Sequence, residues 1–88
     1  MLTPIYLNRF EKDLEKGKRR DKDLGALKEV IELLLQEKSL PVKYYNHKLK
    51  GNFKGYWECH VEPDWLLLYK KTTKEIIFAR LGTHTDLF

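Results

Sequence analysis

Apolar side chains in the first part of the chain recur at the three- and four-residue spacing of amphipathic helices. Phe10 and Leu14 lie on one face of a first helix that we expect to begin near Arg9, with Asn8 as its cap. A second helix is predicted after the capping residue Asp23. Its apolar positions are Leu24, Leu27, Val30, Ile31, Leu34 and Leu35. Together the two helices predict a helical hairpin.

The pattern changes after Pro41 to the aromatic and β-branched composition that is typical of strands. Turn-forming residues divide this part at Pro63-Asp64 and at 72–74. The predicted strands cover residues 55–62, 65–71 and 76–81. Because short turns join them, we expect an antiparallel meander with the helical hairpin on one face. A short strand-like run at 3–7 precedes the hairpin, and the predicted fold class is α+β.

Length and composition narrow the classes of protein that fit this pattern. The 88 residues suffice for one domain, which we expect to span 1–88. A net charge of +4 and a pI near 9.2 favour an anionic partner. A single cysteine and the lack of a basic-then-apolar leader pattern predict a cytoplasmic protein without an internal disulfide. No apolar run approaches the ~20 residues of a membrane span, so no membrane role is expected.

Three histidines, His47, His60 and His84, fall at or just beyond the ends of predicted strands. Alternation along 55–62 places Glu58 and His60 on one face of the sheet. Cys59 then points to the opposite face, where we expect a buried structural thiol beneath the helices.

Alternation on the strand predicted at 76–81 places Ile76, Phe78 and Arg80 on a shared face. We expect this to be the face that the helices leave open. Arg80 would then stand beside His60, where its guanidinium would bring positive charge next to an imidazole.

Histidine is suited to general acid or base catalysis, because its ordinary pKa of about 6.5 lies near neutral pH. Cleavage of RNA through the 2′-hydroxyl needs a base, an acid for the departing 5′ oxygen, and a cation for the charge on phosphorus. The three histidines, with Asp64 and Arg80, supply these parts without a metal or other cofactor. One histidine alone is more often a surface or capping residue. A zinc site made by the histidines and Asp64 is a minor alternative, since no HExxH or CxxC motif is present.

Lysines alternate with aromatic residues just before the predicted sheet, and three of them, Lys48, Lys50 and Lys54, are candidate substrate-binding residues. This mixture suits phosphate contacts and base stacking on single-stranded RNA. Trp65, directly after Asp64, is a further candidate stacking surface. The alternative is a solvated basic loop over core aromatics, with Trp65 as simple packing.

Four stretches of the sequence carry a resemblance to a known family: Asn46 to Gly51, Lys54 to Tyr56, Glu58 to Lys70, and Arg80 to His84 with Leu87-Phe88. They resemble the YafQ branch of the RelE/ParE toxin superfamily. The resemblance covers about half of the chain in detail and the rest in general plan. It implies a RelE-like microbial ribonuclease fold, in which a helical hairpin packs on a twisted antiparallel sheet.

The same resemblance implies the toxin of a type II toxin–antitoxin system. Such a toxin would be a metal-independent mRNA endoribonuclease, or mRNA interferase, that cuts mRNA in the ribosomal A site. A cognate DinJ-like antitoxin would hold it inactive, and operator DNA would be bound only through the antitoxin complex.

The resemblance also implies roles for individual residues at matching positions. The implied catalytic set is His47, Glu58, His60, Asp64, Arg80, His84 and Phe88. His84 would be the general acid, Arg80 would stabilise the phosphate, and Phe88 would position the cut nucleotide. Glu58 would orient His60 or act as a base.

Two positions depart from the family pattern. Lys48 stands where a proline is frequent, and Trp57 stands where an arginine is frequent. The second departure leaves Arg80 and the lysines to supply the cation.

Two other functions stay open at this point. The main alternative is a ParE-like toxin without enzymatic activity that binds a DNA topoisomerase. The third is a plain RNA-binding module that retards RNA without cutting it.

Overall fold

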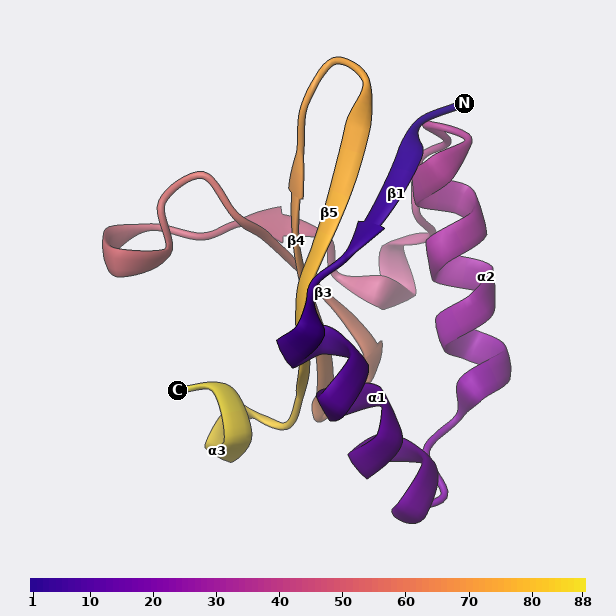
Figure 1. The fold of residues 1–88 in the computed structure, drawn as a ribbon, viewed down its shortest axis with the longest axis vertical. Helices are drawn as coiled ribbons and strands as arrows, with labels where there is room; N and C mark the ends of the chain where they lie inside the picture. Colours follow the sequence, from indigo (N-terminus) through magenta and orange to yellow (C-terminus); the bar gives the residue numbers. More distant parts are fainter.

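The computed structural model describes residues 1–88, which form a five-stranded sheet with a helical hairpin packed on it (Figure 1). The main elements are β1 (Thr3–Tyr6), α1 (Asn8–Arg19), α2 (Leu24–Leu35), β2 (His47–Lys48), β3 (Trp57–Glu62), β4 (Trp65–Lys71), β5 (Glu75–Gly82) and α3 (His84–Leu87). Two short 3-10 helices, η1 (Val42–Tyr44) and η2 (Gly51–Phe53), flank β2. The predicted α+β class and helical hairpin are confirmed. None of the helices combines the length and the apolar character that a membrane span requires.

The strands follow the order β1-β5-β4-β3-β2. β3, β4 and β5 form the predicted antiparallel meander, and β2 extends it with His47 opposite Glu58. β1 pairs in parallel with β5, from Thr3 opposite Glu75 onward. The sheet is therefore mixed, because the two ends of the sequence meet at its edge.

The hairpin buries one face of the sheet, and in Figure 1 α2 lies on the right of the strands while α3 and the loop around η2 lie on the left. The core on the hairpin side consists of Leu2, Phe10, Leu27, Val30, Leu34, Tyr44, Cys59, Val61, Trp65, Leu67, Tyr69, Ile76, Phe78 and Leu81. Trp65 is only 2% exposed. The expectation that it stacks on substrate is therefore wrong, because its ring is enclosed between the sheet and α1.

The predicted shared face of Ile76, Phe78 and Arg80 is also wrong, because a β-bulge interrupts β5. Arg80 pairs with Leu68 and Phe78 with Tyr69, so one residue of β5 between them has no partner. A bulge shifts the alternation of side chains by one residue. Ile76 and Phe78 are consequently buried under the helices, whereas Arg80 lies in the cross-strand row of the opposite face.

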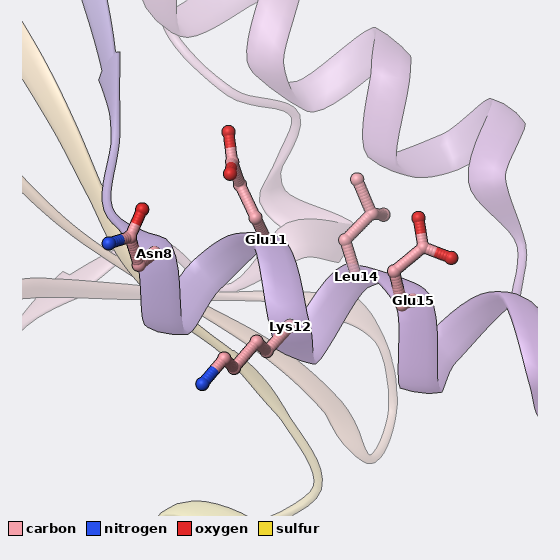
Figure 2. A pocket seen from close by; sticks show the side chains of 5 residues that line it. All are labelled: Asn8, Glu11, Lys12, Leu14 and Glu15. Carbon is pink, nitrogen blue, oxygen red and sulfur yellow. The ribbon is translucent and has the colours of Figure 1, made fainter.

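The two predicted helix caps have different outcomes. Asp23 caps α2 as predicted, accepting a hydrogen bond from the Ala26 N–H at 3.0 Å. Asn8 is not a cap, because Leu7 occupies that position and donates its own N–H to the Phe78 carbonyl. Pairing with β5 thus continues up to the first residue of α1. The side chains that line a hollow on α1 are Asn8, Glu11, Lys12, Leu14 and Glu15, with Lys12 pointing away from the other four (Figure 2).

The short helix α3 is tied to α1 by Asp86. Its carboxylate accepts hydrogen bonds from Lys16 Nζ at 3.1 Å and from Arg20 Nη1 at 2.9 Å. Thr83 and Asp86 form a reciprocal capping box at the start of α3. The bond from the Thr83 N–H, with those from the two cations, holds the pKa of Asp86 well below its ordinary value. The end of the chain is thereby anchored to the last turn of α1.

Gly17→Ala is expected to lower the free energy of unfolding by about 1–3 kcal/mol, because overpacking forces α1 away from the sheet. A Cβ at Gly17 would lie 2.6 Å from Cζ2 of Trp65. The control is Gly25→Ala in the exposed part of α2, where the nearest heavy atom to a new Cβ is 3.4 Å away. Urea unfolding measures both, and equal stability of the two variants would contradict close packing at Gly17.

Asp86→Asn is expected to lower the free energy of unfolding at pH 7 by about 1–2 kcal/mol, because it removes charge-assisted hydrogen bonds. A depressed folded-state pKa stabilises the fold above the unfolded value of about 3.9, and this contribution is lost as the pH falls below it. The difference between variant and wild type should therefore shrink below about pH 4. Chemical unfolding at a series of pH values tests this, with Asp21→Asn as an exposed control. A stability difference that stays constant down to pH 2 would contradict a stabilising role of the ionised Asp86 carboxylate.

Candidate active site

Three histidines from three different elements meet on the face of the sheet that the hairpin leaves uncovered. His47 begins β2, His60 lies in β3, and His84 is the first residue of α3. The ring centres of His47 and His60 are 6.2 Å apart, and those of His60 and His84 are 5.8 Å apart. The three imidazoles therefore form one row.

Glu58 joins two of these histidines from below. It is 5% exposed, and its Oε1 lies 3.4 Å from Nε2 of His47 and 3.3 Å from Nε2 of His60. The cross-strand register puts buried Leu66 beside His60 and buried Leu68 beside Glu58. A buried carboxylate requires a hydrogen-bonding partner, and here His60 supplies it, with the His47 imidazole in contact beside it.

His47 is also held from its other side. Its Nδ1 lies 2.9 Å from the backbone carbonyl oxygen of Tyr45, which can only accept a hydrogen bond. Nδ1 of His47 therefore carries a proton, and Nε2 is the nitrogen that faces Glu58.

His84 has its own carboxylate, Asp64, in the turn between β3 and β4. The Asp64 Oδ1 atom accepts hydrogen bonds from the His84 backbone N–H at 2.9 Å and from Nδ1 at 2.8 Å. These two bonds lower the pKa of Asp64 below its ordinary value. Because Nδ1 is occupied, Nε2 of His84 is the nitrogen that is free to exchange a proton with a ligand.

Arg80 is not beside His60, as the sequence had led us to expect. It lies two strands away, and Asp13 of α1 holds its guanidinium through Nε at 2.7 Å and Nη2 at 3.3 Å. This pairing raises the pKa of Arg80, which stays fully charged. Nη1 has no protein partner and is the part of the group that can meet an anion.

Phe88 lies next to the row of histidines. Its ring centre is 6.4 Å from that of His84 and 5.1 Å from that of Phe53 at the end of η2. The residue is 55% exposed. It extends the row by an aromatic surface that solvent, or a ligand, can reach.

The predicted substrate lysines are not grouped with the histidines. Lys48, Lys50 and Lys54 line a neighbouring hollow of about 590 Å³ that also includes Trp57. The Lys48 ammonium lies 5.3 Å from the Trp57 ring, on the opposite side of β2 from His47. The lysines of this hollow can bind phosphates of a ligand that extends away from the histidines.

Cys59 is fully buried, as predicted, and burial raises the pKa of its thiol to about 12. A thiol in that state is a poor nucleophile. No group of three His, Cys, Asp or Glu side chains is arranged to hold a metal ion.

Sequence reasoning missed two contributors to the site. Asp13 was not singled out among the charged residues of the first helix, yet it holds Arg80 and accepts a hydrogen bond from the Leu81 N–H. Asp13 and Arg80 are 67 residues apart along the chain, so no local sequence pattern indicates their contact. Tyr45 is one of several aromatics between the hairpin and the sheet, and its carbonyl and ring both contact His47.

Comparison with known proteins identifies the family of this chain. Residues 2–88 match the family described as bacterial toxin of type II toxin-antitoxin system, YafQ. The mRNA interferase toxin YafQ of Escherichia coli K12 is 44% identical over 84 residues, covering 94% of this chain and 91% of that protein.

Solved structures of related toxins superpose over the whole chain. The toxin of the E. coli DinJ-YafQ toxin-antitoxin complex has a TM-score of 0.92 at 42% identity, covering 99% of this chain and 97% of that one. A copper-bound mutant toxin from Helicobacter pylori has a TM-score of 0.96 at 38% identity, with both chains fully covered. Sequence and fold agree, and the chain belongs to the YafQ family of toxins from bacterial type II toxin–antitoxin systems.

Proposed function

We propose that this chain is an mRNA interferase, an endoribonuclease that inhibits translation by cutting mRNA in the ribosomal A site. One observation carries the proposal: three imidazoles meet on one face, and two carboxylates hold their rings in orientation. A surface that only binds RNA has no need for buried Glu58 beneath two histidines. The name of the E. coli relative, an mRNA interferase toxin, supports the same activity.

The proposed reaction is attack of a ribose 2′-oxygen on the adjacent phosphorus. One of the two imidazoles that share Glu58 removes the 2′-hydroxyl proton, and a bond forms between the 2′-oxygen and phosphorus. The bond from phosphorus to the 5′-oxygen breaks, and that oxygen takes a proton from His84. The products are a 2′,3′-cyclic phosphate and a free 5′-hydroxyl, with no metal or cofactor required.

His84 is proposed as the general acid because Asp64 binds its Nδ1 and leaves Nε2 free. The lowered pKa of Asp64 keeps it ionised near neutral pH, so it steadily fixes the ring and its tautomer. Asp64 acts through His84 and does not itself exchange a proton with RNA.

The charge that develops on phosphorus needs cations within reach. We propose that Nη1 of Arg80 contributes to this, and that Lys48, Lys50 and Lys54 bind phosphates farther along the chain. Phe88, exposed beside His84, would position the cut nucleotide.

The proposed partners are the ribosome with its mRNA and a DinJ-like antitoxin. The E. coli relative in complex with DinJ supports the second. We further propose that residues 1–88 act as one toxin domain in the cytoplasm. Operator DNA would be contacted only through the antitoxin complex, and no membrane is involved.

His84→Gln is expected to slow cleavage by about 10²–10⁴-fold, because the leaving 5′-oxygen loses its acid. Primer extension on mRNA in a purified translation system locates new 3′ ends inside translated codons. Glu32→Gln, at an exposed position of α2 in the hairpin on the opposite face of the sheet, is the control and should cut like wild type.

Intact mRNA with the wild-type chain would contradict the nuclease. Growth inhibition that survives His84→Gln, together with intact mRNA, would favour the ParE-like toxin that binds a topoisomerase.

Asp64→Asn should lose nearly as much activity as His84→Gln, and the double variant should be no slower than His84→Gln alone. The reason is that residues acting as one unit are strongly non-additive. Single-turnover cleavage rates of the three variants test this. A double variant slower by the product of the two single effects would instead give Asp64 an independent role.

A further inference from the structure

Tyr45 has an unusual backbone conformation for an aromatic residue. Its φ of 45° and ψ of 55° lie in the left-handed region, which is unfavourable for bulky side chains. The conformation directs the Tyr45 carbonyl at Nδ1 of His47, 2.9 Å away. The same turn points the side chain away from the core, and the residue is 63% exposed. Strain of this kind persists where the surrounding structure holds it in place, and it clusters at functional sites.

The ring of Tyr45 contacts two of the three histidines. Its centre lies 4.7 Å from that of His47 and 5.3 Å from that of His60, with the second pair nearly perpendicular. Neither histidine covers the ring, since most of the residue stays in contact with solvent. An aromatic surface is thus available directly beside the imidazoles, just before β2 on one side of β3 in the strand order, whereas His84 and Phe88 follow β5 on the other side.

A hollow of about 520 Å³ opens next to this ring. Its lining residues are Asp23, Ala26, Lys43, Tyr44, Tyr45, His60, Val61, Glu62 and Pro63. That volume is within the range of roughly 300–1,000 Å³ found for small-molecule sites.

The charges of the hollow select the part of a nucleotide that fits it. The carboxylates of Asp23 and Glu62 lie at the α2 end, where Glu62 accepts the Asp23 N–H at 2.9 Å. They would repel a phosphate, whereas a neutral base meets no such penalty. Lys43, whose ammonium lies over the Tyr44 ring, offers the only full positive charge in the lining.

We propose that Tyr45 and this hollow form a subsite for an unpaired nucleobase, which stacks on the Tyr45 ring while its neighbouring phosphate lies at the histidines. The subsite rests on the proposed ribonuclease function and adds a substrate-binding residue to it. Tyr45 takes no part in proton transfer. It fixes the register of the RNA by binding the base on one side of the cut, with Phe88 available to the base on the other side.

The test pairs variants of Tyr45 with RNA that lacks one base. Tyr45→Asn removes the ring, keeps the backbone carbonyl that binds His47, and suits a left-handed conformation. Tyr45→Phe retains the stacking surface. Val42→Asn, at a 93% exposed position of the same loop, is the matched control. Single-turnover cleavage is measured on ribosomes programmed with intact mRNA, and with mRNA carrying an abasic nucleotide on either side of the cut.

On intact mRNA, Tyr45→Asn should reduce cleavage by about 10- to 100-fold, the effect of losing one stacked base. Val42→Asn should cut at the wild-type rate, and Tyr45→Phe, which keeps the stacking ring, should recover most of the activity that Tyr45→Asn loses. The abasic nucleotide on one side should slow the wild type by a similar factor and leave Tyr45→Asn almost unaffected, because the variant has already lost the stacking partner.

Equal slowing of the wild type and Tyr45→Asn by every abasic substitution would overturn the subsite and leave the nuclease intact. Loss of activity in Tyr45→Phe would likewise overturn stacking. A wild type that cuts none of the RNAs would instead overturn the proposed function. Thermal unfolding accompanies the series, and Tyr45→Gly, which also accepts the left-handed conformation, replaces Tyr45→Asn if that variant unfolds.

Discussion

The bonds from α1 to Asp86 are the interaction on which the site depends. α3 contains four residues, and a helix of one turn has no independent stability in water. Asp86 gives it a capping box and two cations from the neighbouring helix. His84 and Phe88 stand at the two ends of that short segment, so the last turn of α1 sets where both of them lie.

A second constraint comes from the unequal faces of the sheet. The helical hairpin packs on one face only, and the other carries the row of imidazoles and the buried carboxylate of Glu58, with apolar neighbours on β4. Glu58 is almost as buried as the core residues, yet it is surrounded by imidazoles. Reduced contact with water strengthens the hydrogen bond between Glu58 and His60 and makes an unpaired carboxylate costly. The histidines are therefore held in orientation by the same burial that gives the sheet its stability.

Local patterns predicted much of this structure. Helical spacing gave the hairpin, and alternation along β3 correctly grouped Glu58 with His60 and turned Cys59 toward the core. The errors arose where a longer-range effect outweighs the local one. A single bulge in β5 places Phe78 on the face opposite to the predicted one. The pairing of Leu7 with β5 makes Leu7, and not the expected Asn8, the capping residue of α1. These features depend on partners distant in sequence, which periodicity does not register.

The candidate site shows the same division. Residue type and strand position were enough to identify the histidines, whereas the ion pair of Arg80 with Asp13 depends on how α1 docks against β5. Trp65 illustrates the limit of composition, because an aromatic residue beside Asp64 fits a stacking surface and a core position equally well. The packing of α1 makes it a core position, because Gly17 has no side chain and lets α1 approach the Trp65 indole closely.

The parallel pairing of β1 with β5 has a consequence for how the protein acquires its activity. Thr3 to Tyr6 find their partners only at Glu75 to Phe78, so the edge of the sheet closes over almost the full length of the chain. Contacts this distant in sequence slow folding, and they form after the intervening chain has been made. A nascent chain lacks β5 and α3, and with them His84, until residues 75–88 have been made. The sheet edge and the row of histidines therefore cannot be completed before that point, because β1 has no partner in the sheet other than β5.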